Sequence, residues 1–113
     1  MKIKQISLID ILPIRTSHGC GQKRILLRKE ETNTTLTQIA ITALSAGEES
    51  GAHIHPTMEE CFLVRKGEIR IELEEKCISG SADDFIHIPA GTMHNVIALT
   101  NVELLTIGCA TIK

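Results

Sequence analysis

Three side chains within one short segment have the chemistry of a metal site. His53 and His55 lie two residues apart, and Glu59 and Glu60 follow closely. If the segment begins as a β-strand, the two-residue period places both imidazoles on one face. The proline after His55 should turn the chain, so that either Glu59 or Glu60 returns beside the histidines. Two imidazoles and a carboxylate on adjacent strands suit a divalent transition metal, and His94 is available as a fourth ligand.

The elements that must position these residues are short β-strands. Residues 68–74 give the clearest signal, because apolar and charged side chains alternate there. We expect a hairpin turn at 65–67, with Gly67 at the position that needs a positive φ, and a type I turn at 88–91. The expected strands cover 3–12, 24–28, 36–44, 53–55, 60–64, 68–74, 85–88, 94–99 and 102–111, with room for a short one within 75–83.

The spacing of these strands indicates the fold class. About nine or ten short strands follow one another with turn signals between them, and no segment has a convincing helical period. There is no internal repeat and no linker, and 113 residues suffice for one domain. We therefore expect an all-β sandwich or barrel in a single domain over residues 1–113.

The composition excludes several classes of function. The net charge is −2 and no basic cluster with interleaved aromatics occurs, so we expect no nucleic acid as partner. The apolar runs are far too short for a membrane span or a signal peptide. The chain has no Tyr and no Trp, which removes a tyrosine acid or base and leaves only two Phe rings for stacking.

The cysteines favour a reducing compartment. They form no C-x-x-C pair, and two of the four lie inside apolar runs. Buried free thiols in the cytoplasm are the favoured interpretation, and a zinc site built from scattered cysteines is the alternative. The four are Cys20, Cys61, Cys77 and Cys109.

Two motifs in this chain resemble those of the cupin superfamily. Its first motif, G-x5-H-x-H-x3or4-E-x6-G, is matched without a gap by Gly47, His53, His55, Glu60 and Gly67. Glu60 is the carboxylate that fits, because it leaves six residues before the second glycine. The resemblance implies a double-stranded β-helix, or jelly-roll barrel, with a metal inside one end. It also implies a homodimer.

The second motif, G-x5-P-x-G-x2-H-x3-N, is matched in part. Pro89, Gly91 and His94 fit it, whereas Asp83 replaces its first glycine and Ala98 replaces its asparagine. Neither departure falls on a ligand position of the family. The ligand set that the resemblance implies is therefore intact.

The implied ligands are His53, His55, Glu60 and His94. Such a set suits Zn(II), Fe(II), Mn(II), Ni(II) or Cu(II), and the sequence does not select among them. One carboxylate beside a divalent ion gives a site of charge +1. Four protein ligands on an octahedral ion leave two positions for water, O₂ or a chelating small molecule.

The sequence leaves open the roles of other residues near the motifs. Glu59 should face solvent, because its neighbour takes the inward position. His87 could line the pocket or face outward, and Gln38 could reach the pocket from its strand. Phe62 shares the parity of Glu60 and could form part of the pocket wall. His18 lies in a loop and is expected to be a polar surface residue.

Three functions are compatible with these features. The first is a small metalloenzyme, an isomerase or dioxygenase, that acts on an oxygen-rich or phosphorylated-sugar-like substrate. The second is a non-catalytic, metal-dependent sensor or carrier of a small ligand. The third is a structural barrel with a fortuitous metal. A DNA-binding regulator is disfavoured because no helix-turn-helix accompanies the barrel, and the sequence identifies no catalytic residue beyond the ligands.

Overall fold

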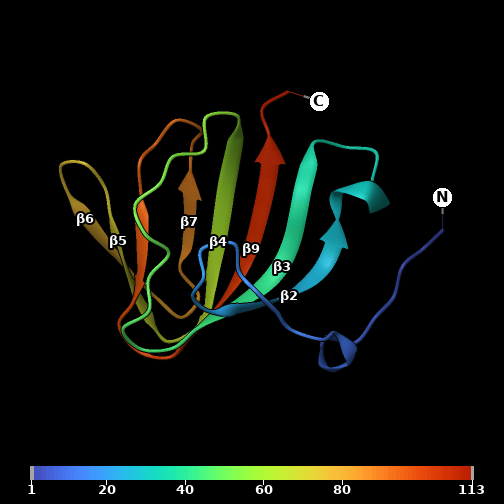
Figure 1. Cartoon of the computed structure of the whole chain (residues 1–113), viewed down its shortest axis with the longest axis horizontal. Coiled ribbons are helices and arrows are strands. Elements are labelled where there is room, and N and C mark those ends of the chain that lie inside the picture. Colours follow the sequence, from blue (N-terminus) through green and yellow to red (C-terminus); the bar gives the residue numbers. More distant parts are fainter. Residues whose placement is uncertain (1, 113) are drawn as a thin grey trace.

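Two antiparallel β-sheets make up the molecule (Figure 1). The computed structural model describes residues 2–112, so the two end positions of the expected domain, 1 and 113, lie outside it. The strands are β1 (Ile14–Arg15), β2 (Gln22–Arg28), β3 (Leu36–Leu44), β4 (Met58–Lys66), β5 (Glu68–Glu72), β6 (Cys77–Ser81), β7 (Phe85–Ile88), β8 (Asn95–Ala98) and β9 (Val102–Ala110). Short 3₁₀ turns η1 (Leu8–Asp10) and η2 (Lys29–Glu31) complete the elements.

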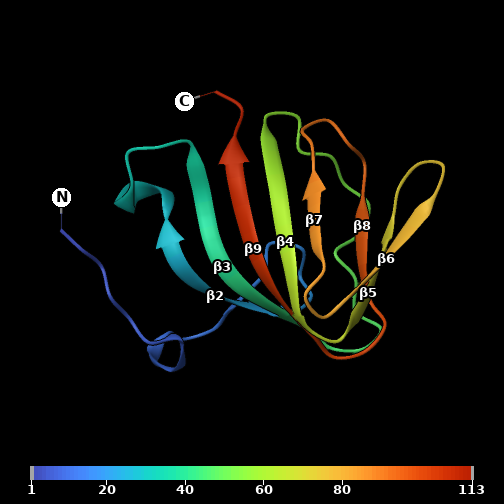
Figure 2. The same cartoon turned by 180° about the vertical axis from the view of Figure 1, so that it is seen from behind.

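The larger sheet has the order β1-β2-β3-β9-β4-β7, and the smaller one has the order β6-β5-β8. In the larger sheet, the neighbouring strands β3, β9 and β4 are each nine residues long. The late strand β9 pairs with β3 on one side and β4 on the other, so segments far apart in the chain lie side by side (Figure 2). The structure is thus an all-β jelly-roll barrel, as the sequence predicts.

The hairpin predicted at 65–67 is wrong. β4 pairs with β7 and β9, whereas β5 pairs with β6 and β8, so the turn joins two sheets. Gly67 still has a φ of +83°, and a Cβ there would clash with the carbonyl oxygen of Asn101. The corner lets Val64 on one sheet and Ile69 on the other face the same core, both fully buried.

The edge strand expected over residues 3–12 is also wrong. This segment runs along the outside and forms η1 near its end. Ile3, Ile9 and Leu12 are 98%, 88% and 84% exposed. Their apolar side chains therefore gain nothing from packing within the described chain, and no sheet ladder holds this backbone. No helix in residues 2–112 is long and apolar enough to cross a membrane.

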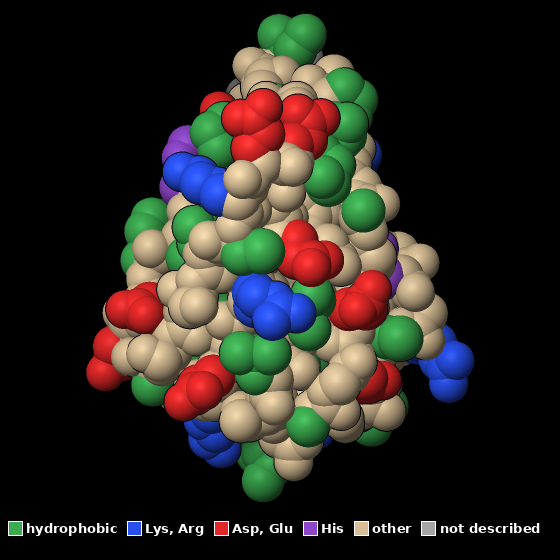
Figure 3. Space-filling model, turned by 90° about the vertical axis from the view of Figure 1, so that its left-hand side faces the viewer, with side chains coloured by type: hydrophobic (Ala, Val, Ile, Leu, Met, Phe, Trp, Pro, Cys, Tyr) green, Lys and Arg blue, Asp and Glu red, His purple; other side chains and the backbone are tan. Residues whose placement is uncertain are grey.

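The core fills one end of the space between the sheets. Its fully buried side chains include Val64, Ile69, Ile71 and Leu104, contributed by both sheets. On the outer side of β5 and β6, acidic, basic and apolar side chains are interspersed (Figure 3). The other end of the space is not filled by the core, and the polar residues of the motifs gather there.

Asp83 shows how the turn before β7 tolerates the departure from the second motif. Its φ is +76°, and it is the one non-glycine residue with a positive φ in residues 2–112. Asp83 N–H donates to Val64 O at 2.7 Å, and Asp84 N–H donates to Ser81 O. The turn thus keeps the left-handed backbone that glycine adopts most easily, at some cost in strain.

Candidate metal centre

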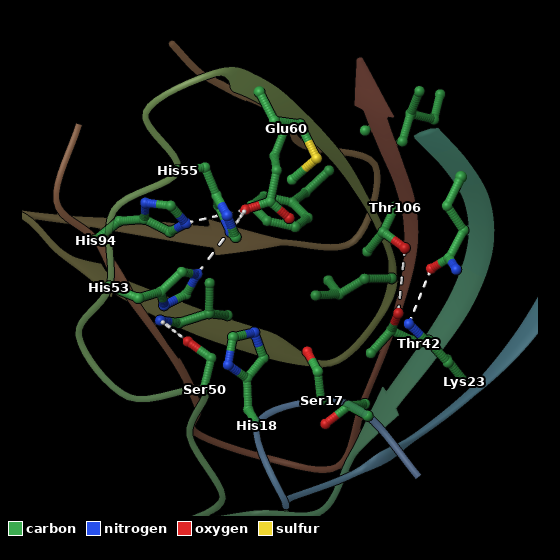
Figure 4. A pocket seen from close by; sticks show the side chains of 18 of the residues that line it. Ser17, His18, Lys23, Thr42, Ser50, His53, His55, Glu60, His94 and Thr106 are labelled. Atoms are coloured by element: carbon green, nitrogen blue, oxygen red, sulfur yellow. Dashed lines mark hydrogen bonds and ion pairs between the residues drawn. The ribbon is translucent and has the colours of Figure 1, made fainter. Parts of the chain in front are cut away.

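Three imidazoles and a carboxylate converge at the open end of the barrel (Figure 4). One ligand atom from each of His53, His55, Glu60 and His94 lies within 4.8 Å of the others. Oε1 of Glu60 is 3.0 Å from His55 Nε2, 3.1 Å from His94 Nε2 and 3.9 Å from His53 Nε2. The group could hold a metal ion, because all three Nε2 atoms face the same oxygen.

Different elements supply the four side chains. Glu60 points inward from β4 with the parity of Phe62, as predicted, and His94 immediately precedes β8. The segment of His53 and His55 is not the expected strand but a loop between β3 and β4. Two backbone hydrogen bonds of 3.0 Å between His53 and His94 nevertheless hold it.

The second histidine of the loop is held from the other motif. Gly91 N–H donates to His55 O at 2.9 Å, which ties the loop to the Pro-x-Gly turn. Gly91 has a φ of +81°, which explains the need for glycine at this position of the motif. The loop therefore keeps both imidazoles on one side without a continuous ladder.

Hydrogen bonds from the Nδ1 atoms fix the tautomers of His53 and His94. His53 Nδ1 lies 2.7 Å from Gly51 O, and His94 Nδ1 lies 2.9 Å from Thr92 O. A carbonyl oxygen only accepts, so each Nδ1 carries a proton and each Nε2 is left to face Glu60. A bare Nε2 lone pair would repel a carboxylate oxygen at these distances. A proton or a cation must therefore lie between them, and the donor set fits a divalent ion.

The electrostatics of the cluster follow from this arrangement. Burial disfavours the charged form of His94, but the hydrogen bond to Glu60 and that to Thr92 O outweigh it and raise the pKa of His94. Burial also opposes ionisation of Glu60, yet the hydrogen bond from His94 and the nearby imidazoles lower its pKa. Burial lowers the pKa of His53, and the neighbouring imidazoles add to that effect. Both shifts favour the charged forms, and so favour an ion pair between His94 and Glu60 when no metal is bound.

A cavity of about 280 Å³ opens beside the four residues. Its floor is apolar and belongs partly to the core, through Leu44, Phe62, Val96 and Leu104. One wall carries polar side chains that the sequence motifs do not include: Thr16, Ser17, Lys23, Gln38, Thr42 and Thr106. The cavity is large enough for a small molecule next to a metal.

The structure assigns the residues whose roles the sequence left open. Gln38 and Phe62 both line the cavity, and Phe62 is only 5% exposed. His87 faces outward instead, where its Nε2 lies 2.7 Å from Glu59 Oε1 on the far side of the sheet. Glu59 is half-exposed, in line with the expectation that it faces solvent.

His18 is exposed, as expected of a loop residue, but it also has a place at the cavity that the sequence does not suggest. Its ring centroid lies 4.5 Å from that of His53, and it lines the cavity. Burial and the charge of His53 lower the pKa of His18. The loop that connects β1 to β2 folds over the cavity mouth and so brings in a fourth imidazole, a tertiary contact that local sequence does not reveal.

The cysteines differ from the expectation in part. All four are free, but Cys77 is exposed and the other three are only partly buried. Among residues 2–112, the group able to hold a metal contains no cysteine. The scattered-cysteine zinc site therefore has no support in the structure.

Comparison with known proteins agrees with the fold and the motifs. Residues 40–108 match the family model described as "Cupin domain". An "Uncharacterized HTH-type transcriptional regulator YdiP" from Escherichia coli K12 is 34% identical over 62 residues, 55% of this chain. The chain spans about a fifth of the length of that relative, 20%. Residues 2–112 contain no α-helix, so this match does not extend to a helix-turn-helix in the described chain.

Solved structures resemble the whole chain in shape. A "predicted oxalate decarboxylase" from Thermotoga maritima has a TM-score of 0.86 at 23% identity, over 95% of this chain and 99% of its own. Ectoine synthase from P. lautus has a TM-score of 0.80 at 18% identity, over 96% and 78%. At these identities the likeness is one of fold.

Proposed function

We propose a function from the premise that this chain belongs to the cupin domain family. The protein binds one divalent transition metal ion and acts on a small oxygen-rich molecule beside that ion. His53, His55, Glu60 and His94 are the proposed ligands. The observation that carries the proposal is the convergence of three Nε2 atoms on Oε1 of Glu60. Two of these imidazoles are oriented by backbone carbonyls, as expected of metal-ligating histidines.

The donor set limits the ion and its chemistry. Imidazole nitrogen and carboxylate oxygen suit Zn(II), Fe(II), Mn(II), Ni(II) or Cu(II). Bound there, the ion would polarise an oxygen of the substrate as a Lewis acid. The protein's own part is to orient the ligands, to limit water through the apolar floor, and to present polar side chains to the rest of the substrate.

A metal-dependent isomerase or dioxygenase is the reaction class that we favour. The cavity lies directly against the four residues and its wall offers hydroxyl and amide groups, which suits a substrate rich in oxygen. Enzymes occur among the similar folds, such as ectoine synthase. His18 is the imidazole nearest the centre that is not a proposed ligand, and so it is a candidate for moving a proton.

The alternative is a non-catalytic sensor that binds a small ligand in a metal-dependent way. The match to an HTH-type transcriptional regulator favours it, because a cupin domain within a regulator would serve as the ligand-binding part. The two functions share the metal centre and the cavity. They differ only in whether the bound molecule is converted.

Assembly as a homodimer and a cytoplasmic location belong to the same proposal. The exposed apolar side chains of the N-terminal segment, Ile3, Ile9 and Leu12, support an interface with a second copy. Four free cysteines support a reducing compartment.

Elemental analysis of the purified protein, combined with a thermal-shift screen of small oxyacids and sugar phosphates, tests the proposal. We expect one transition metal ion per chain, lost in His55→Ala and kept in the matched control His87→Ala, whose imidazole lies outside the barrel. Conversion of a stabilising compound would support the enzyme, and stabilisation without conversion would support the sensor. A wild-type protein that binds no transition metal would refute both.

A further inference from the structure

Lys23 is a charged side chain inside the cavity that the metal centre does not use. It lies on β2 with the parity of buried Ile25, so it faces inward, and it lines the cavity. Its Nζ donates to Gln38 Oε1 at 3.0 Å, as Figure 4 shows. The contact holds a flexible side chain in one place against the cavity wall.

The ammonium group of Lys23 has no acidic partner within the described chain. Lys4 and Lys66 pair with Glu31 and Glu103, but among residues 2–112 no carboxylate lies within 4.0 Å of Lys23 Nζ. An ammonium group has three N–H donors, and Gln38 takes one of them. A half-buried charge with donors to spare can bind an anion that enters the cavity.

The strand register places this charge opposite the metal centre. Gln38 pairs with Gly108 on β9, and Gly108 pairs with Glu60 on β4, so the three lie in one cross-strand row. Two strand spacings of about 4.8 Å separate the backbone of Gln38 from that of Glu60. Gly108 has no side chain of its own, and the Thr37 hydroxyl and the Met58 sulfur, which are hydrogen-bonded to each other, lie where its Cβ would be. The cavity of about 280 Å³, which Lys23 and Glu60 both line, has room for a molecule of about five carbons.

Hydroxyl groups along the wall define what lies between the two ends. Thr106 Oγ1 donates to Ala40 O at 3.2 Å, and Thr42 Oγ1 lies 3.2 Å from Thr106 Oγ1. Since Thr106 has already given its only proton, Thr42 donates to it and keeps free lone pairs. Thr42 is the cross-strand neighbour of Lys23, so an acceptor stands beside the charge. A ligand hydroxyl fits there.

We propose that Lys23 anchors an anionic group of the ligand, so that the ligand is a short hydroxy acid with a second acidic group at the end away from the metal. This inference rests on the proposed metal centre. A divalent ion, Glu60 and Lys23 together give the cavity a charge of +2, which a dianion balances. The second group is a carboxylate or a phosphate, since both accept hydrogen bonds from an ammonium group.

Matched probes test the anchor on the wild-type protein loaded with zinc. 2-Hydroxyglutarate and 2-hydroxypentanoate share the metal-binding hydroxy acid and the chain length, but only the first has a second carboxylate. 3-Phosphoglycerate carries a phosphate in its place. Calorimetry at neutral pH should show one of the two doubly acidic probes binding roughly ten- to a hundredfold more tightly than 2-hydroxypentanoate. The stronger of the two identifies the group.

Variants locate the effect. Lys23→Met should abolish the preference for the doubly acidic probe, and Lys76→Met, the same change in the exposed turn after β5, should keep it. Because the probes are also compared on the wild-type protein, the test stands even if Lys23→Met fails to fold. Equal affinities for the three probes, or an unchanged preference in a folded Lys23→Met protein, would overturn the inference while the metal centre stands. Zinc-loaded protein that binds none of them at millimolar concentration would overturn it too. Failure of the wild-type protein to bind zinc would overturn the proposed function and the anchor with it.

Discussion

Metal binding should expel a proton from His94. This imidazole is 1% exposed, and both of its nitrogens face acceptors, Thr92 O at 2.9 Å and Glu60 Oε1 at 3.1 Å. These bonds outweigh burial and raise its pKa above the ordinary 6.5, so at pH 6.5 the metal-free protein holds His94 mainly as the cation. A metal ion needs the Nε2 lone pair and must displace that proton. Affinity should therefore rise with pH, by about tenfold, or 1.4 kcal/mol, per unit below the pKa of His94.

Calorimetric titration with zinc in two buffers of different protonation enthalpy counts the protons released. We expect more than half a proton from His94 at pH 6.5, because its pKa is raised, and the release should decline as the pH rises through that pKa. His53 adds less, because burial lowers its pKa and leaves it largely neutral there. His94→Gln should lose the share of protons that His94 releases, whereas His87→Gln, on the outer face, should leave the release unchanged. Zinc binding without proton release at pH 6.5 would refute the assigned ion pair.

Four further outcomes follow from the fold. Ile69→Ala, at a fully buried core position, should lower the free energy of unfolding by about 2–5 kcal/mol in urea titrations. The control Ile112→Ala, at a position that is 77% exposed, should lower it by far less. Equal losses would contradict the core assignment. Gly67→Ala should cost about 1–3 kcal/mol in the same assay, since its φ is +83° and a Cβ would clash with Asn101 O; a neutral result would contradict the corner geometry. Asp83→Gly should raise the melting temperature slightly, because φ is +76° there, and a fall would argue against strain at that turn. Zinc at a concentration of about a hundred times its Kd should stabilise the chelator-treated protein by roughly 2.7 kcal/mol. The effect should be seen as a reversible rise in melting temperature. No rise would mean that zinc does not bind the folded state in preference to the unfolded state.

The sequence predicted the convergence of the four side chains well, because the spacing of the motifs determines it. His53 and His55 share a side of the chain whether the segment is a strand or an extended loop, so the wrong element still gave the right convergence. Glu60 points inward because it alternates with Glu59 on β4, which the two-residue period requires. His94 needed the second motif, since nothing local distinguishes it from other strand histidines.

The errors arose where contacts between distant segments of the chain determine which strands pair. A turn with Gly67 favours a hairpin locally, but β4 finds its partners in β7 and β9, which lie far along the chain. Residues 3–12 mix apolar and polar side chains and could be an edge strand, yet the described chain offers them no pairing strand. In both cases the local pattern does not identify the strand that a segment pairs with.

The missed cavity residues have different explanations. Lys23 lies one residue before the predicted strand 24–28 and has the parity of buried Ile25, so a longer strand there would have placed a charged residue on an apolar face. His18 gave none, because only the fold of its loop brings it against His53. A polar residue with core parity in a barrel strand is thus a useful indication of a pocket.

Anomalous diffraction from crystals of the zinc-loaded protein, recorded at the zinc absorption edge, tests the central claim most directly. The account predicts one peak per chain, within about 2.0–2.3 Å of Nε2 of His53, His55 and His94 and of a carboxylate oxygen of Glu60. A strong peak elsewhere on the chain with none among these four side chains would contradict it.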